Sequence, residues 1–350
     1  MYVDDLKLPD MLHAAVLRSP YAHAKIKSVN VSDALSASGV RLVFTAKDLP
    51  KDLELPAEEC EDGTKIARPV LASSEVSYAG EPIAFIVAES RYEAEDALEL
   101  IQVEYEQLPS VVDPLVAIRE ESPRVHESLK TNIVKAETVA SGDVEDSFRK
   151  AFKIVSLDLL NQRLAPSPLE TRAMLASYNP GADFLNIWLS TQGPFQSRSM
   201  LAETLGIEEN RVRVIAPEVG GGFGAKLSLY SEDLLVCLAT MKLGLPVKWT
   251  ETRSENLQNM THGRGQIQHV ELASNEKGRI LGMKVKLIGD AGAYLTEGSA
   301  DAGFTLKMAP GGYIIPTYYG EAQIVLTNKV PHDAYRGASR RLAARGDLSC

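Results

Sequence analysis

Short apolar runs separated by turn signals mark the first part of the chain. Runs at residues 12–17, 39–44 and 83–88 have the length and apolar character of β-strands. Ser90 follows as a candidate helix N-cap, with Glu93 three residues later as in a capping box. Apolar residues then recur at helical spacing up to residue 101, where the next strand is expected. This pattern predicts a strand–helix–strand unit in a small α+β layer.

The pattern changes after residue 110. Residues 113–135 contain prolines, several charges and no sustained periodicity, which is typical of a connector. Beyond it, the pattern predicts strands at 184–189, 211–215, 247–250 and 280–288, and helices over about 195–205 and 232–242. We therefore expect an α+β protein with domains at 1–110 and 135–350, joined by a connector at 111–134.

Composition and charge narrow the class of protein. The 350 residues are 45% hydrophobic and 24% charged, which excludes disordered, collagen-like and coiled-coil chains. No apolar run reaches the ~18 residues of a membrane span, and the first residues lack a signal segment, so we expect a cytoplasmic protein. The net charge of −10 argues against a nucleic-acid partner. The three cysteines lack C-x-x-C spacing, which argues against a disulfide framework, a zinc site or an iron–sulfur cluster in this chain.

The strongest local motif is Gly-Gly-Gly-Phe-Gly-Ala-Lys at residues 220–226. It lies between the predicted strand at 211–215 and the helix that starts near residue 232. Its glycines permit positive φ and let backbone N–H groups approach an anionic ligand without obstruction by Cβ atoms. A tight packing bend is the alternative. The large apolar Phe223 favours a binding site, because a packing bend does not require it.

The same segment also matches the dinucleotide-binding pattern G-x-G-x-x-G/A. Glu251, at the end of a following strand, would then be the ribose-binding acid of an NAD or FAD enzyme. However, Pro217 and Glu218 separate the preceding strand from the glycines. Glu251 also lies farther along the chain than the ~20 residues that the pattern expects. The match is weak.

Two further segments carry candidate polar groups. Gln192 follows the strand at 184–189, and its amide can donate to an oxo group, accept from a substrate or cap the next helix. Arg336 and Arg340 flank a Gly-Ala-Ser stretch, which suits contacts to phosphate or an oxyanion, with a solvated basic turn as the alternative. Glu170 is a possible acid–base group. The histidines have no metal-ligand spacing, so no metal-ligating residue is assigned.

Several motifs, in the order in which they occur along the chain, resemble those of a known protein family. They are Arg-Ser-Pro-Tyr-Ala-His-Ala at 18–24, Gly-Glu-Pro-Ile-Ala at 80–84, Thr191-Gln192, the glycines of 220–224 and the arginine segment at 334–340. Together they resemble the molybdenum-binding large subunit of the xanthine oxidase family, and most of all its aerobic carbon monoxide dehydrogenase large-chain-like branch. The resemblance extends to about residue 340.

The resemblance implies an N-terminal α/β hammerhead domain followed by the first molybdenum-cofactor-binding domain. It implies a molybdopterin cofactor, usually in the cytosine dinucleotide form, with iron–sulfur and FAD groups on small and medium partner subunits. It also implies that the cofactor-binding residues are Gln192, Gly221, Gly222, Phe223, Gly224, Arg336 and Gly337.

The chain departs from the family pattern at two places. Gly337 stands where carbon monoxide dehydrogenases have a copper-binding cysteine, which favours a hydroxylase that oxidises an aldehyde or N-heterocycle with water as the oxygen source. After Arg340 the family continues into a second cofactor domain that carries the glutamate acting as general base. Residues 341–350 do not match that continuation, so we expect the second domain to be absent and assign no catalytic residue.

The sequence leaves three interpretations open. In the first, a second molybdenum polypeptide supplies the missing domain of a split large subunit. In the second, the chain is a truncated or frameshifted inactive remnant. In the third, residues 220–225 bind NAD or FAD in a dehydrogenase.

Overall fold

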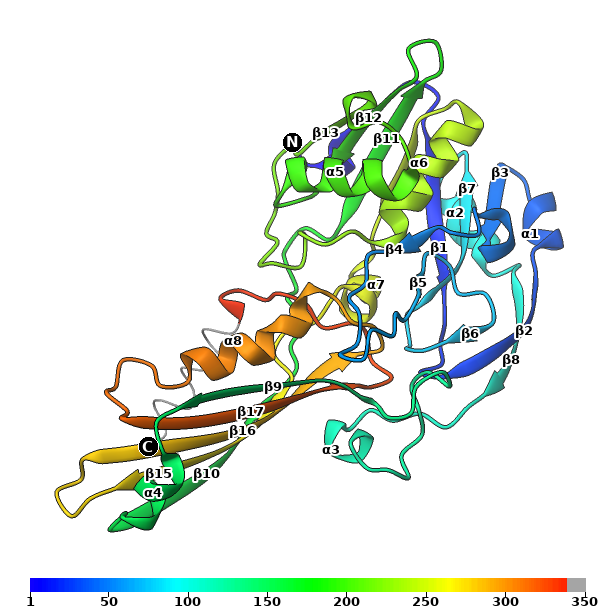
Figure 1. Ribbon diagram of the computed structural model, residues 1–350. Coiled ribbons are helices and arrows are strands. Elements are labelled where there is room, and N and C mark those ends of the chain that lie inside the picture. The colour runs from blue at the N-terminus through cyan, green and yellow to red at the C-terminus, as the bar shows by residue number, and fades with distance from the viewer. Residues whose placement is uncertain (339–350) are drawn as a thin grey trace. The chain divides into compact units, whose positions relative to one another are not determined.

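The computed structural model describes residues 1–338 in two compact units that interleave along the sequence (Figure 1). Unit 1 comprises Met1–Pro56, Ala67–Pro109 and Pro166–Met260; unit 2 comprises Ala57–Ile66, Ser110–Ala165 and the chain from Thr261 onward. Each unit therefore takes residues from both predicted domains. The division at 1–110, 111–134 and 135–350 stays a prediction.

A seven-stranded sheet forms the centre of unit 1, in the order β13-β12-β11-β14-β1-β7-β3. Its strands are β1 (Leu12–Arg18), β3 (Val40–Thr45), β7 (Pro82–Ala88), β11 (Ala173–Asn179), β12 (Phe184–Leu189), β13 (Val212–Ile215) and β14 (Val247–Thr250). Strand β1 pairs in parallel with β14 and antiparallel with β7. One sheet thus joins strands that the sequence pattern had assigned to two domains.

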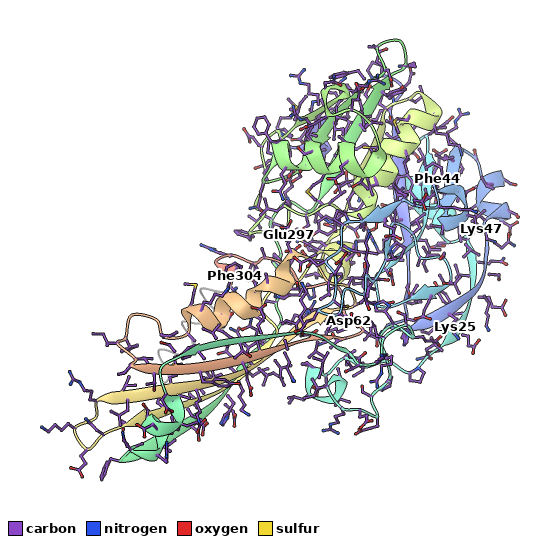
Figure 2. The ribbon with its side chains drawn as sticks, in the orientation of Figure 1. Lys25, Phe44, Lys47, Asp62, Glu297 and Phe304 are labelled. Atoms are coloured by element: carbon purple, nitrogen blue, oxygen red, sulfur yellow. The ribbon has the colours of Figure 1, made fainter. Side chains whose placement is uncertain are left out.

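The apolar runs explain the core of this sheet. Every residue of β7 is buried, as its uninterrupted apolar sequence requires. Phe44 of β3, labelled in Figure 2, stacks on Phe85 of β7, with ring centroids 6.4 Å apart. Helix α6 (Ser231–Leu243) covers β11 and β14, and α5 (Pro194–Leu205) packs beside β13. The predicted helices and the predicted strands are confirmed.

The predicted strand–helix–strand unit is present, but its strands belong to two sheets. Helix α2 (Arg91–Leu98) starts at Ser90, whose hydroxyl accepts from the Glu93 N–H at 3.2 Å. The following strand, β8 (Gln102–Gln107), joins β2 (Ala24–Asn30) and β6 (Glu75–Val76) in a separate three-stranded sheet. Most of the polar side chains of β8 are exposed, so the strand does not fit the fully buried layer that contains β7. Further short elements of unit 1 include α1 (Ser32–Ser36), β4 (Glu54–Leu55), β5 (Arg68–Pro69) and α7 (Arg253–Asn259).

A buried ion-pair network ties the end of β1 to α6 and β14. Arg18 donates to Glu232 at 2.6 Å and to Glu255 at 3.0 Å. Arg172 donates to Glu232 at 3.0 Å and to Glu251 at 2.6 Å. Burial alone would raise the pKa of Glu232, but the guanidinium groups of Arg172 and Arg18 lower it to about 2. Breaking such a pair by removing one partner costs about 3–5 kcal/mol, so the network constrains how these segments fold together.

Unit 2 is built on a five-stranded sheet in the order β10-β15-β16-β17-β9 (Figure 1). The strands are β9 (Ile133–Ser141), β10 (Lys153–Asn161), β15 (Gln266–Ser274), β16 (Ile280–Gly292) and β17 (Thr317–Leu326). Helix α8 (Asp301–Met308) packs against β9, β16 and β17, while α3 (Pro114–Ala117) and α4 (Val144–Arg149) are short. Among residues 1–338, no helix combines the length and the apolar character that a membrane span needs.

Candidate functional site

The glycine-rich segment has a defined turn conformation. Gly221, Phe223 and Gly224 have positive φ angles of 99°, 57° and 107°. The N–H of Ala225 donates to the carbonyl of Gly222 at 3.1 Å and closes a tight turn. Positive φ is uncommon for a residue other than glycine, so the conformation of Phe223 is held by its surroundings. Its ring packs back against Gly221, where an added Cβ would lie 3.1 Å from a ring carbon.

Gln192 follows β12 and turns its side chain onto this segment. Its amide oxygen accepts from the backbone N–H of Gly224 at 2.8 Å and of Lys226 at 3.4 Å. Both partners are donors, so the oxygen faces the loop and the NH₂ group remains available as a donor. A Cβ on Gly222 would lie 2.3 Å from this oxygen, and only glycine fits without a shift of Gln192. Helix α5 has Gly193 as its N-cap without a side-chain bond, so the alternative that Gln192 caps it is wrong.

The loop presents further donors. Among the described residues, the N–H groups of Gly221 and Gly222 have no hydrogen-bond acceptor. Together with the Gln192 NH₂ group, they form a set of donors on adjoining backbone and side chain. Such a set matches an anionic, acceptor-rich group such as a metal-oxo centre or a phosphate. The residues present therefore fit the oxygen-rich part of a molybdopterin cofactor.

Glu170 lies beside the same loop but is already engaged. Its carboxylate forms an ion pair with the Lys226 ammonium at 3.0 Å. Burial lowers the pKa of Lys226, and Glu170 acts against this shift. The sequence singled out Glu170 as a possible acid–base group. The structure instead places it as a partner of the loop.

Arg336 and Gly337 belong to unit 2, in a segment held by Arg264. The buried guanidinium of Arg264 donates to the carbonyls of Tyr335 at 2.9 Å, Arg336 at 2.9 Å and Ala338 at 3.1 Å. It also lies over the Tyr335 ring, 4.8 Å from the centroid. The segment is therefore held by its backbone, while the Arg336 side chain is exposed. Arg340 lies outside the described residues.

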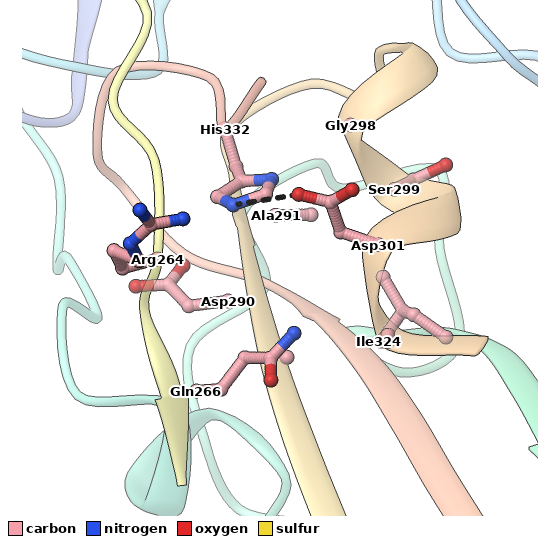
Figure 3. A pocket seen from close by; sticks show the side chains of 11 residues that line it. Arg264, Gln266, Asp290, Ala291, Gly298, Ser299, Asp301, Ile324 and His332 are labelled. Carbon is pink, nitrogen blue, oxygen red and sulfur yellow. Dashed lines mark ion pairs between the residues drawn. The ribbon is translucent and has the colours of Figure 1, made fainter. Parts of the chain in front are cut away.

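A small cavity lies next to Arg264 in unit 2 (Figure 3). It has a volume of about 10 Å³, enough for one water molecule and too small for a cofactor or substrate. His332 and Asp301 line it, with the His332 Nε2 atom 4.0 Å from a carboxylate oxygen. Burial lowers the pKa of His332 to about 4, so this contact is not a salt bridge at neutral pH. We assign the cavity to the internal packing of unit 2.

Comparisons with known proteins identify the family of this chain. Residues 125–344 match the family model described as molybdopterin cofactor-binding domain, and residues 1–109 match that of the aldehyde oxidase and xanthine dehydrogenase a/b hammerhead domain. The chain belongs to this molybdopterin-binding aldehyde oxidase and xanthine dehydrogenase family. The predicted fold, a hammerhead domain followed by a first cofactor-binding domain, is confirmed, as is the resemblance that implied it.

Three similar proteins illustrate what share of a relative's length this chain covers. The carbon monoxide dehydrogenase large chain of Afipia carboxidovorans is 38% identical over 97% of this chain and 44% of its own length. The crystal structure of quinoline 2-oxidoreductase from Pseudomonas putida 86 superposes with a TM-score of 0.92 at 36% identity, over 99% of this chain and 46% of that chain. The nicotinate dehydrogenase large molybdopterin subunit of Eubacterium barkeri is 30% identical over 96% of this chain and 77% of its own length. The chain spans less than half the length of the first curated relatives it matches.

Membership of this family and the environment of Glu251 both contradict the dinucleotide interpretation. Glu251 is buried, and its carboxylate accepts from Arg172 at 2.6 Å and from Asn256 at 2.7 Å, so it is not available to a ribose. Helix α6 starts only at Ser231, well after the glycines, so no helix N-terminus adjoins them as the dinucleotide pattern requires. This interpretation of residues 220–225 is wrong.

Two residues that shape the candidate site were not singled out from the sequence. Lys226 closes the glycine motif, but its ion pair depends on a segment far away in sequence. Arg264 stands between Gly263 and Gly265, and both Arg264 and Gly265 have positive φ, at 69° and 71°. A charged residue flanked by glycines was the available signal for Arg264.

Proposed function

We propose that this chain is one polypeptide of a molybdenum hydroxylase that binds part of the molybdenum cofactor. The observation that carries the proposal is a set of donors: the Gln192 NH₂ group and the N–H groups of Gly221 and Gly222, which have no acceptor among residues 1–338. These groups hold an anionic oxo or pterin group by hydrogen bonds, and Phe223 shields it on the loop side. Arg336 and Gly337, which lie in unit 2, are proposed as cofactor-binding residues on the resemblance alone. The cytosine dinucleotide form of molybdopterin is the proposed cofactor.

When bound, that cofactor supplies the two-electron redox chemistry. The overall reaction takes a C–H bond of the substrate and one water, and yields a C–OH group, two protons and two electrons. The chain's own contribution is to orient the cofactor and to keep a hydrogen bond on its oxo group. We assign no general base to this chain, because the resemblance implies that the family's general-base glutamate belongs to the second cofactor domain.

A split large subunit is the proposed context of the chain. The Eubacterium barkeri nicotinate dehydrogenase subunit supports this, because the chain covers 77% of a protein named as a molybdopterin subunit. A second molybdenum polypeptide would supply the remaining domain. Iron–sulfur and FAD subunits would accept the electrons, and the proposed location is the cytoplasm. Gly337, together with the quinoline and nicotinate enzymes among the similar proteins, supports an N-heterocycle as substrate, with an aldehyde as the alternative.

Co-expression tests this function. The chain is produced with iron–sulfur, FAD and second molybdenum polypeptides from the same source, and the complex is analysed for molybdenum. The expected result is one molybdenum per chain and reduction of a dye by quinoline, nicotinate or an aromatic aldehyde, with ¹⁸O from labelled water in the product. A complex without molybdenum despite all partners would contradict the proposal and favour the inactive remnant. Activity on aldehydes alone would retain the hydroxylase and change its substrate class.

A further inference from the structure

Glu170 holds the first glycine of the loop from two sides. Its Oε2 atom accepts from the N–H of Gly220 at 2.8 Å, and its own backbone N–H donates to the Gly220 carbonyl at 3.1 Å. A Cβ on Gly220 would lie only 2.5 Å from the Cβ of Glu170. The entry to the loop is therefore fitted directly against Glu170.

Lys226 holds the other end of the loop. Its side chain is fully buried, and Nζ donates to the Glu170 carbonyl at 2.7 Å, to Glu170 Oε2 at 3.0 Å and to Ser190 Oγ at 2.8 Å. Its backbone carbonyl accepts from the Gln192 N–H at 3.0 Å. Lys226 thus connects two residues that contact the loop. Glu170 contacts the first glycine of the loop, Gly220, and Gln192 contacts Gly224.

We propose that Glu170 and Lys226 are positioning residues, which fix the distance between the loop N–H donors and the Gln192 amide. The proposal rests on the proposed function for what those donors bind. Charge-assisted hydrogen bonds are shorter and stronger than neutral ones, and a buried ion left without its partner is strongly disfavoured. The pair therefore holds both ends of the loop in one arrangement, and loss of either partner releases both.

The contacts of the Glu170 carboxylate allow the effect of its charge to be measured separately from the effect of its hydrogen bonds. Oε2 accepts from Gly220, Lys226 and Ser190, whereas Oε1 is buried and has no partner among the described residues. In Glu170→Gln, the amide oxygen can take the three contacts of Oε2 while the NH₂ group occupies the place of Oε1. This variant removes the charge and retains the acceptor. Glu170→Ala removes both.

The test uses the full chain in the co-expressed complex, with Glu170→Gln, Glu170→Ala and Lys226→Met. Thr240→Val is the matched control, because Thr240 is also fully buried in unit 1 and also donates a hydrogen bond, to the Ala176 carbonyl at 3.1 Å. Thr240 lies in the last turns of α6, at the end of that helix farther from the glycine loop in the sequence. The measurements are molybdenum content per chain, amide hydrogen exchange at Gly220 and Gly224, and Tm.

We expect Glu170→Ala and Lys226→Met to lose at least about tenfold in molybdenum content, the equivalent of one hydrogen bond to a charged group. Exchange should accelerate at both Gly220 and Gly224. Glu170→Gln should lose less, and Thr240→Val should keep its molybdenum at an equal loss in Tm. Faster exchange at Gly220 alone, or equal molybdenum loss in Thr240→Val, would overturn the proposal. If the wild-type complex holds no molybdenum, the proposed function fails, and the exchange at Gly224 still decides whether the pair positions the loop.

Discussion

The side-chain oxygen of Gln192 accepts a hydrogen bond from the backbone N–H of Gly224 at 2.8 Å. This contact joins the end of β12 to the middle of the glycine loop, and it fixes the direction of the amide. Since a backbone N–H can only donate, the NH₂ group of Gln192 is the part that remains for a ligand. The hydrogen bond from Gly224 therefore orients Gln192 so that its NH₂ group can donate to a ligand.

Replacing Gln192 by glutamate tests this direction. A carboxylate oxygen can still accept from Gly224 and Lys226, so we expect Tm to change little. The variant lacks the outward donor and adds a negative charge where an anionic group is proposed. We expect about 10- to 100-fold less molybdenum per chain, the effect of losing one hydrogen bond to a charged group. Metal analysis of the purified complex measures this.

Gln196→Glu is the control for Gln192→Glu, because Gln196 is exposed on α5 and the substitution adds the same charge. Equal molybdenum loss in both variants would assign the effect to charge in general. Full molybdenum retention in Gln192→Glu would contradict the assignment of the NH₂ group as a donor to the cofactor.

Gly222→Ala is expected to lower the molybdenum content while changing the unfolding free energy little. The new Cβ would come within 2.3 Å of the Gln192 side-chain oxygen, which must move away and give up its bond to Gly224. Because a flexible side-chain end can move at little cost and Gly222 does not have positive φ, the loss in unfolding free energy should stay below about 1 kcal/mol. Molybdenum content should fall nonetheless. Gly312→Ala, where an added Cβ meets nothing within 4 Å, should change neither quantity.

The Arg264 clamp gives a prediction for unit 2. A lysine cannot reproduce the planar fork that donates to the carbonyls of Tyr335, Arg336 and Ala338. Arg264→Lys should therefore lower the unfolding free energy by about 1–3 kcal/mol, and hydrogen exchange should rise in a peptide that covers these three residues. Arg149→Lys, at an exposed position of α4, should leave both unchanged. Unchanged exchange in Arg264→Lys would show that the segment is held by other contacts.

Several of the predicted elements have long apolar runs that are largely buried. Strands β1, β3 and β7 and helix α6 belong to this group. Four of the five strands of unit 2 were not predicted, and burial is continuous in none of the four. In β15, two positions on the buried face are polar. Gln266 and Gln268 are buried there, and the Gln268 side-chain amide donates to that of Gln266 at 3.0 Å. Only tertiary partners explain polar residues in such positions.

The candidate site divides in the same way. The glycine motif and Gln192 were visible because residue type and local spacing mark them. The pairing of Lys226 with Glu170 and the clamp formed by Arg264 were not visible, because each joins segments that are distant in sequence. Sheet order was hidden for the same reason, as the pairing of β1 with β14 in unit 1 illustrates.

Asp233 makes the stability of the chain depend on pH. Burial in the first turn of α6 raises the pKa of its carboxyl to about 7, although Arg172 acts against this shift. Between about pH 4 and pH 7, the folded chain retains a proton that the unfolded chain has lost. The folded state therefore binds more protons in this window, and the unfolding free energy contributed by this group falls as the pH rises.

Asp233→Asn is neutral at every pH and should remove this dependence. The amide oxygen can still accept from the Tyr230 N–H, as the carboxylate does at 3.0 Å. Relative to wild type, the unfolding free energy of the variant should rise by up to about 4 kcal/mol between pH 4 and pH 7, which corresponds to a shift of three pKa units. Urea unfolding at pH 4, 5.5 and 7 measures this difference. A difference that stays constant over the three pH values would mean that Asp233 ionises in the folded chain as it does in the unfolded one.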